Sequence, residues 1–253
     1  MKKCKYCKID IDSKARICPN CKKKQGMPVW KIVLIVFGVL FVIGLFGGED
    51  NSANGTNSGT NSESSSTAKP SKELTESEKM LKKIVELIDE GLAYDTGSYI
   101  KGDITPGDYA FIKFSGSGSY YCEKDAANNI IDNENFDSFG YVKVHGAGNL
   151  ETQAVLVNVS AFEKLGVTGA KQIYEILNNQ KDYNQGGYYK VGTDIEPGSY
   201  VVESMGGSGY YAILSGPVSN SEIIDNDNFS GRAAVNLTNG QYIEITRSTI
   251  TKQ

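Results

Sequence analysis

The longest apolar stretch of the chain is a candidate membrane helix. Residues 32–48 carry no charge, and the twenty residues 29–48 suffice for a helix to cross about 30 Å of lipid. The run is apolar on every face rather than along one stripe, which disfavours a buried core helix. A cleaved signal peptide is the other alternative, but residues 46–49 (Phe-Gly-Gly-Glu) lack a small-x-small cleavage pattern. The pattern therefore predicts one transmembrane helix at 29–48.

The two segments that follow are first polar and then amphipathic. Residues 49–70 are rich in Ser, Asn, Thr and Gly, which predicts a flexible linker. Residues 71–95 show helical spacing, and Thr75 and Glu78 have the spacing of a capping box. The apolar stripe of this helix consists of Leu81, Ile84, Val85, Ile88 and Leu92. Such a stripe normally packs on its own domain, and self-association or a partner helix is the alternative.

The C-terminal part contains an internal repeat. Residues 103–109 (Asp-Ile-Thr-Pro-Gly-Asp-Tyr) recur as 194–200, and residues 130–136 recur as 223–229. Each copy combines Pro-Gly turns with short β-branched and aromatic runs, which predicts antiparallel strands in a sandwich-like unit. The expected elements are a first β repeat at 97–166, a connecting helix at 168–181 and a second β repeat at 186–253. The pattern leaves open whether the repeats form one domain or two.

The formal net charge of −4 hides an uneven distribution. Residues 1–31 contain ten Lys or Arg against two Asp or Glu, which gives +8, whereas residues 32–253 contain sixteen against twenty-eight, which gives −12. Because basic residues favour the cytoplasmic side of a membrane span, this division predicts a cytoplasmic N-terminus and an extracytoplasmic C-terminal domain. The expected protein is multidomain and mainly β outside, and it is anchored in the bilayer by a single pass.

Four cysteines near the N-terminus have the spacing of a metal site. Two Cys-x-x-Cys turns, one at Cys4 and Cys7 and the other at Cys18 and Cys21, can supply the four thiolates of a closed tetrahedral zinc site. A segment as short as residues 1–26 needs such a metal in order to fold. A redox dithiol pair or two disulfides are the alternatives. The pattern predicts a structural zinc ribbon at 1–26, and a single stacking aromatic, Tyr6, disfavours nucleic-acid binding by it.

The four cysteines and the apolar run after them resemble the start of single-pass envelope proteins of Gram-positive bacteria. Those proteins have an N-terminal zinc ribbon, one membrane helix, a polar tether and extracytoplasmic repeats. The Asp-Ile-x-Pro-Gly-x-Tyr repeats are also similar to repeats of uncharacterised bacterial surface proteins. The resemblance implies an outer part that senses or binds the cell wall or its antibiotics, and it implies no catalytic residue.

Paired tyrosines and repeated carboxylates are the candidate ligand-binding residues of the repeats. Side chains alternate across a sheet, so one tyrosine of each pair should be buried and the other is free to stack on a sugar ring. The carboxylates are compatible with calcium, although alternating Asp and Asn is also typical of a turn. The tyrosines are Tyr120, Tyr121, Tyr210 and Tyr211, and the carboxylates are Asp132, Glu134, Asp225 and Asp227.

The residues do not favour catalysis. The single histidine, His145, has no Ser or Cys motif beside it, and Cys122 aligns with Ile213 of the second repeat, which indicates a buried small apolar residue. The leading hypothesis is a non-enzymatic binding or sensing module whose outer partner is a cell-wall polymer or an envelope protein. The alternatives are a tether that recruits a cytoplasmic protein through the ribbon and an extracytoplasmic hydrolase acting through the repeated carboxylates.

Overall fold

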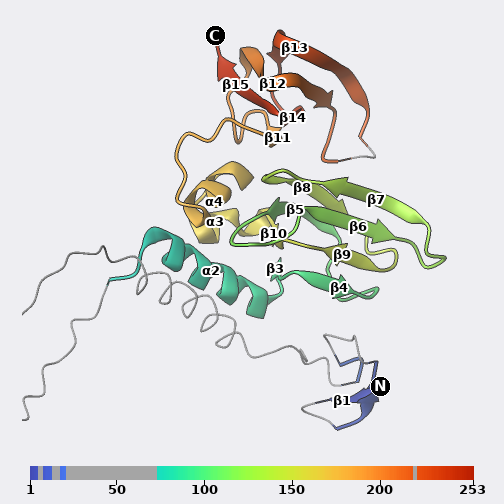
Figure 1. Cartoon of the computed structure of the whole chain (residues 1–253). Helices are drawn as coiled ribbons and strands as arrows, with labels where there is room; N and C mark the ends of the chain where they lie inside the picture. Colours follow the sequence, from blue (N-terminus) through green and yellow to red (C-terminus); the bar gives the residue numbers. More distant parts are fainter. Residues whose placement is uncertain (5–7, 13–17, 21–72, 219–220) are drawn as a thin grey trace, which may run out of the picture.

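The computed structural model describes residues 1–4, 8–12, 18–20, 73–218 and 221–253 (Figure 1). In these residues no helix combines the length and the apolar character that a membrane crossing requires. The predicted span at 29–48 and the predicted linker at 49–70 lie outside the described residues. The expected fold class is therefore corrected to a mainly β protein with three short helices in its described part, and the single-pass membrane localisation is withdrawn.

The described N-terminal residues form a small hairpin. Strand β1 (Lys2–Lys3) pairs antiparallel with β2 (Asp10–Ile11). The Cys4 amide donates to the carbonyl of Ile9, 2.8 Å away, which closes the turn between the strands. Ile11 is buried together with Cys4 and Cys18, so these three residues make a minimal core of their own.

Helix α2 (Glu76–Glu90) begins at a capping box and ends at a left-handed glycine. The Thr75 hydroxyl accepts from the Glu78 amide, and the Glu78 carboxylate accepts from the Thr75 amide, which satisfies two donors that a helix start leaves free. Gly91, with φ of 77°, terminates the helix. The helix is shorter than the sequence pattern indicates, since residues 93–94 already belong to a strand. It buries Met80, Ile84 and Leu87 against the remainder of the fold.

The first β unit consists of two antiparallel four-stranded sheets (Figure 1). One sheet has the order β3 (Ala93–Tyr94), β10 (Val155–Asn158), β5 (Gly107–Ile112) and β8 (Phe139–Val144). The other has the order β4 (Gly97–Tyr99), β9 (Leu150–Thr152), β6 (Tyr120–Lys124) and β7 (Ile130–Asn135). The chain changes sheet at every connection between consecutive strands of this unit except the one between β6 and β7.

The second unit repeats this pairing with longer strands. Its strands are β11 (Gly187–Lys190), β12 (Gly198–Leu214), β13 (Ile223–Leu237), β14 (Tyr242–Thr246) and β15 (Ser248–Lys252). Strand β12 pairs with β15 through its first half and with β14 through its second half, as β5 pairs with β10 and β6 with β9. A register irregularity between Glu203 and Ser208 marks the place where the first unit divides one strand into two.

The ladder registers correct the alignment of the two copies. Cys122 pairs with Asn133 and Glu151, and Ala212 pairs with the corresponding Asn226 and Glu244. Cys122 is therefore equivalent to Ala212 and not to Ile213. The same registers place the repeated Asp-Asn segments inside β7 and β13, so the interpretation of these segments as turns is wrong.

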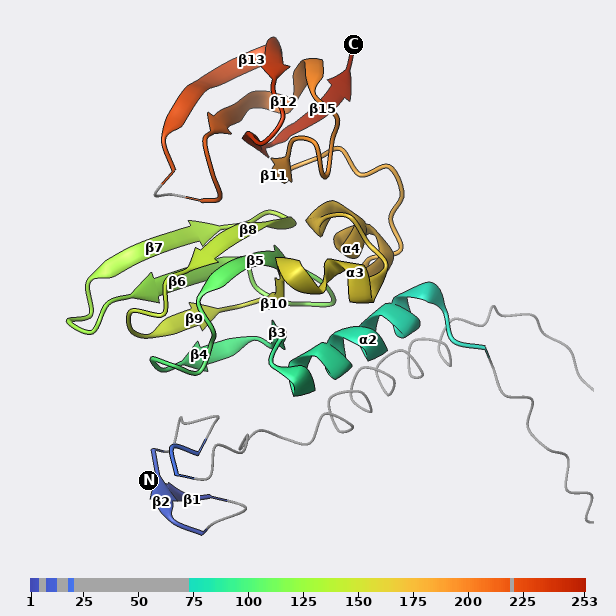
Figure 2. The ribbon, with the colours of Figure 1, turned by 180° about the vertical axis from the view of Figure 1, so that it is seen from behind.

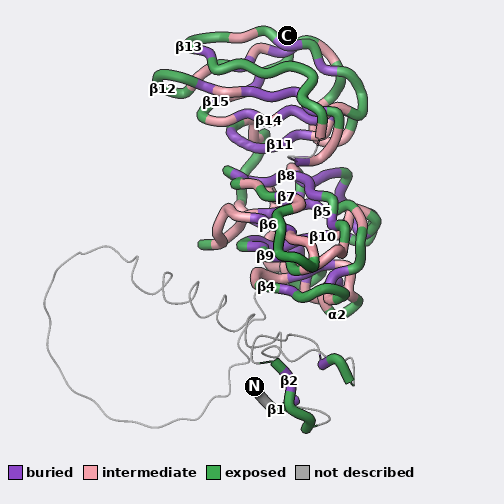
Figure 3. The backbone as a smooth tube through the Cα atoms, turned by 90° about the vertical axis from the view of Figure 1, so that its right-hand side faces the viewer, coloured by how far each residue is buried: buried purple, intermediate pink, exposed green. Residues whose placement is uncertain are grey.

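The two units share one hydrophobic core. After the 3₁₀ turn Val159–Ala161, the short helices α3 (Phe162–Leu165) and α4 (Ala170–Leu177) lie beside α2 and lead the chain to the second unit (Figure 2). The ring centroids of Phe139 in the first unit and Tyr189 in the second are 5.0 Å apart. Figure 3 shows buried segments in both units.

A carboxylate of the second unit links three segments. The Asp194 side chain accepts from the Tyr141 hydroxyl at 2.7 Å, from the Lys171 amide at 3.0 Å and from the Lys190 amide at 2.9 Å. Tyr141 lies in β8, Lys171 in α4 and Lys190 in β11, so one side chain ties the first unit, the connecting helix and the second unit together. Burial raises the pKa of Asp194, and the three donors oppose that shift.

Candidate functional site

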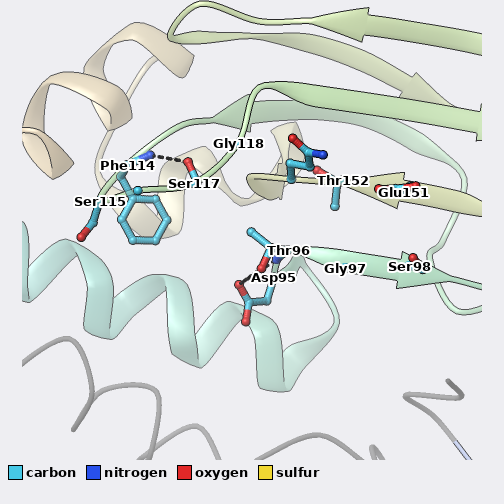
Figure 4. A pocket seen from close by; sticks show the side chains of 12 residues that line it. Asp95, Thr96, Gly97, Ser98, Phe114, Ser115, Ser117, Gly118, Glu151 and Thr152 are labelled. Carbon is cyan, nitrogen blue, oxygen red and sulfur yellow. Dashed lines mark hydrogen bonds between the residues drawn. The ribbon is translucent and has the colours of Figure 1, made fainter. Parts of the chain in front are cut away.

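A cavity of about 560 Å³ opens on the first unit, beside the ends of β4 and β9 (Figure 4). Its size falls in the range of small-molecule and peptide-side-chain sites. Its walls come from the turn before β4, the loop between β5 and β6, and β9. The lining residues are Asp95, Thr96, Gly97, Ser98, Phe114, Ser115, Gly116, Ser117, Gly118, Glu151, Thr152 and Gln153.

The loop wall of the cavity is fixed by glycines and by its own hydrogen bonds. The Ser117 hydroxyl accepts from the Phe114 amide at 3.0 Å, and Gly116 has a φ of 77° that favours glycine. A Cβ atom at Gly118 would lie 2.1 Å from the Gln153 side chain. The Gly-Ser-Gly sequence is thus required by a tight turn that packs on β9, and it leaves Phe114 half-buried at the rim.

The chemistry of the cavity is polar and acidic. Asp95 and Glu151 contribute carboxylates, and among the described residues that line it none is Lys, Arg or His. Asp95 accepts from the Thr96 amide at 2.7 Å, which holds that carboxylate at the rim. Hydroxyls and the Gln153 amide supply further hydrogen-bonding groups. Such a lining suits a neutral or positively charged ligand and disfavours a phosphate or another anion.

The predicted tyrosines alternate between the two faces of their strands. Tyr121 and Tyr211 are buried, whereas Tyr120 and Tyr210 are half-buried. Tyr120 lies on the face of Glu151, and its pKa is raised, first by a hydrogen bond with Cys122 and then by burial and by the nearby Cys122 and Glu151. The Tyr211 hydroxyl donates to Asp225 at 2.9 Å. Sugar stacking by these tyrosines stays a prediction, and Tyr120 is the member of the set closest in register to the cavity.

The predicted calcium ligands are divided between the two units. Asp132 is buried and Glu134 half-buried on β7, while Asp225 and Asp227 are exposed on β13. Within the described ranges there is no group of three or more His, Cys, Asp or Glu side chains that could hold a metal ion, so the expected metal-binding character is corrected for this part of the chain.

The predicted zinc ligands are only partly described. Cys4 and Cys18 are buried in the hairpin core, whereas Cys7 and Cys21 lie outside the described residues. Cys4 and Cys18 belong to different Cys-x-x-Cys turns, and both are buried in the same small cluster. This proximity is compatible with a zinc site made of four thiolates. Zinc at these four residues stays a prediction.

Sequence reasoning did not identify a buried carboxylate in the first unit. Glu123 is only 1% exposed and accepts from the amides of His145 and Gly146 and from the Nδ1 of His145 at 3.0 Å. It faces Asp132 across the β6–β7 ladder, and burial raises the pKa of Asp132 to about 6. Because Ile213 replaces Glu123 in the second unit, the repeat itself offered the only sequence signal.

A second carboxylate pair lies between the units. The hydroxyl of Tyr188 in β11 interacts with Glu134 of the first unit and with Glu244 of the second. Burial and then the nearby Glu134 raise the pKa of Glu244 to about 7. The interface therefore contains an acidic group that titrates near neutrality.

Searches with the sequence against protein-family models and against curated proteins find no match.

Proposed function

We propose that the chain is a non-enzymatic binding module and that the cavity of the first unit is its ligand site. The observation that carries this proposal is an open cavity of about 560 Å³ whose walls combine a half-buried aromatic ring with carboxylates, hydroxyls and an amide. Binding sites commonly pair an apolar contact with a few directed polar groups. The candidate partners are a cell-wall polysaccharide and a protein.

The scaffold around the cavity supports a binding role. The loop 114–118 is pinned to β9, because the Gly118 amide donates to the Gln153 carbonyl at 2.9 Å, and the Phe114 side chain packs partly on the core. A preformed site loses less conformational entropy on binding than a flexible loop would. The buried Glu123, by contrast, accepts from the amides of the exposed His145 and of Gly146, holds the turn after β8 in place and is not part of the cavity lining.

A matched pair of variants tests the proposal. Phe114→Ala removes the aromatic rim, and Met205→Ala makes the corresponding change in the second unit, where Met205 is 48% exposed. The probe in one arm is cell-wall polysaccharide purified from the cells that produce this protein. The probe in the other arm is the set of proteins that those cells secrete. We expect saturable binding in one arm, weakened about tenfold by Phe114→Ala and unchanged by Met205→Ala. Absence of saturable binding in both arms, or equal effects of the two variants, would reject the cavity as the ligand site.

A further inference from the structure

The second unit contains a counterpart of one wall of the cavity, and that counterpart is already covered. In the first unit Ser98 pairs with Glu151, and in the second unit Tyr188 pairs with Glu244 at the same position of the ladder. The hydroxyl of Tyr99 donates to the carbonyl four residues earlier, as does that of Tyr189, which extends the equivalence into the preceding turn. Gly186 and Gly187 thus correspond to Thr96 and Gly97 of the cavity wall.

The occupant of this counterpart is a corner of the first unit, the residues Phe136, Asp137 and Ser138 between β7 and β8. The ring centroids of Phe136 and Tyr188 are 5.0 Å apart in an edge-to-face arrangement. The Ser138 hydroxyl donates to the carbonyl of Gly186, and a Cβ atom at Gly186 would lie 2.6 Å from the Asp137 carboxylate. In the second unit a polypeptide corner therefore packs on the counterpart of the cavity wall that precedes β4, and in the first unit that wall borders an open cavity.

We infer that the cavity of the first unit binds a corner of a partner polypeptide, in which an aromatic residue lies two positions before a Ser or Thr. This inference rests on the proposed function, and it names the class of ligand. The hydroxyl of the partner donates to the carbonyl of Thr96, as Ser138 donates to Gly186. The aromatic side chain of the partner lies over Ser98, as Phe136 lies against Tyr188 in the second unit.

The difference between Thr96 in the first unit and Gly186 in the second restricts the middle residue of the partner corner. Thr96 carries a side chain where Gly186 has none, so the residue that corresponds to Asp137 must be smaller. Asp95 and Glu151 also repel a carboxylate placed between them. The partner corner accordingly has the form aromatic-small-Ser/Thr and carries no acidic residue at its centre.

The probe is a synthetic peptide of residues 130–144 of this sequence that carries Asp137→Ser, titrated into the full chain and followed by fluorescence anisotropy. We expect saturable binding with a Kd below about 1 mM. Peptides that also carry Ser138→Ala or Phe136→Ala should bind about fivefold to tenfold more weakly. The first loses the hydroxyl that donates to the Thr96 carbonyl, and the second loses the aromatic ring. The peptide with the natural Asp137 should bind more weakly than the Asp137→Ser peptide.

Ser98→Tyr in the protein tests whether the peptide occupies the cavity. The variant restores the ring that contacts Phe136 in the second unit, so it should strengthen peptide binding several-fold. If cell-wall polysaccharide binds and is weakened by Phe114→Ala while no peptide binds, the polypeptide inference is overturned and the proposed function stands. If neither peptide nor polysaccharide binds, the inference is rejected, and the proposed function is rejected with it when secreted proteins also fail to bind. If peptide binding is unaffected by Ser98→Tyr, the peptide occupies another surface and the inference is wrong.

Discussion

Ionisation of Glu244 should contribute to the pH dependence of the stability of the protein, alongside the buried Asp132 and Asp194. The pKa of Glu244 is raised from the usual 4.5 to about 7, first by burial and then by the nearby Glu134. The folded state therefore holds a proton that the unfolded chain releases between these two values. The contribution of this group to stability is fully present below about pH 4.5, decreases as the pH rises, and is lost above about pH 7.

The size of the effect follows from the difference between the two pKa values. A shift from 4.5 to about 7 corresponds to at most about 3–4 kcal/mol, at about 1.4 kcal/mol per pKa unit. This is an upper bound because Glu244 is only half-buried and water screens part of the interaction. Glu244→Gln keeps the shape and the hydrogen-bond acceptor for Tyr188 but cannot ionise. The variant should therefore match the parent protein near pH 4.5 and exceed its stability by up to about 3–4 kcal/mol at pH 8.

Urea unfolding at pH 5 and pH 8 measures this difference. For a domain of this size each kcal/mol corresponds to about 2–4 °C in Tm, so thermal unfolding provides a second readout. Glu151→Gln is the matched control, because Glu151 occupies the equivalent ladder position in the first unit and is exposed. It should leave the pH dependence unchanged. If Glu244→Gln shows the pH dependence of the parent protein, or is less stable than the parent at pH 8, the assignment of the interface as proton-sensitive is refuted.

Three further substitutions probe the turn, the joint and the first helix, each measured by urea unfolding. Gly118→Ala places a Cβ atom 2.1 Å from the Gln153 side chain and should cost about 1–3 kcal/mol, and an unchanged midpoint would contradict the close packing of the loop on β9. Tyr141→Phe removes both hydrogen bonds of the hydroxyl, the one donated to Asp194 and the one accepted from the Ala170 amide, and should cost about 1–3 kcal/mol, and an unchanged midpoint would contradict a role of this hydroxyl in joining the units. Thr75→Ala removes the cap of α2 and should cost about 1 kcal/mol, whereas Thr75→Ser should retain most of the stability.

The repeat and its strand-rich character could be read from the sequence because Pro-Gly turns and alternating residues are local signals. The alignment of Cys122 could not, since the Gly-Ser-Gly segment of the first copy contains one residue more before its tyrosine pair than that of the second. Only the ladder shows that the extra residue lies before β6, which makes Cys122 equivalent to Ala212. Local similarity identifies repeats, and register is decided by pairing partners that are distant in sequence.

The sequence did not predict the candidate site either, because its residues are also brought together from positions that are distant in sequence. Asp95, Phe114 and Glu151 come from three separate segments, and no spacing in the sequence relates them. Glu123 reads as an exposed residue of a strand, yet it is buried because the amides of His145 and Gly146, more than twenty residues away, satisfy its oxygens. Burial of a carboxylate depends on donors that only the tertiary structure brings together.

Ser98 and Tyr188 occupy the same ladder position in the two repeats, but the structure places different constraints on the two side chains. Tyr188 is 4% exposed and must remain large and aromatic, because it seals the joint between the two units. Ser98 is exposed, and in the part of the chain that the structure describes no second β unit packs on it, so the joint between the units places no constraint on its size. One copy of the repeated surface thus maintains the architecture, and the other can bind a partner without loosening that joint.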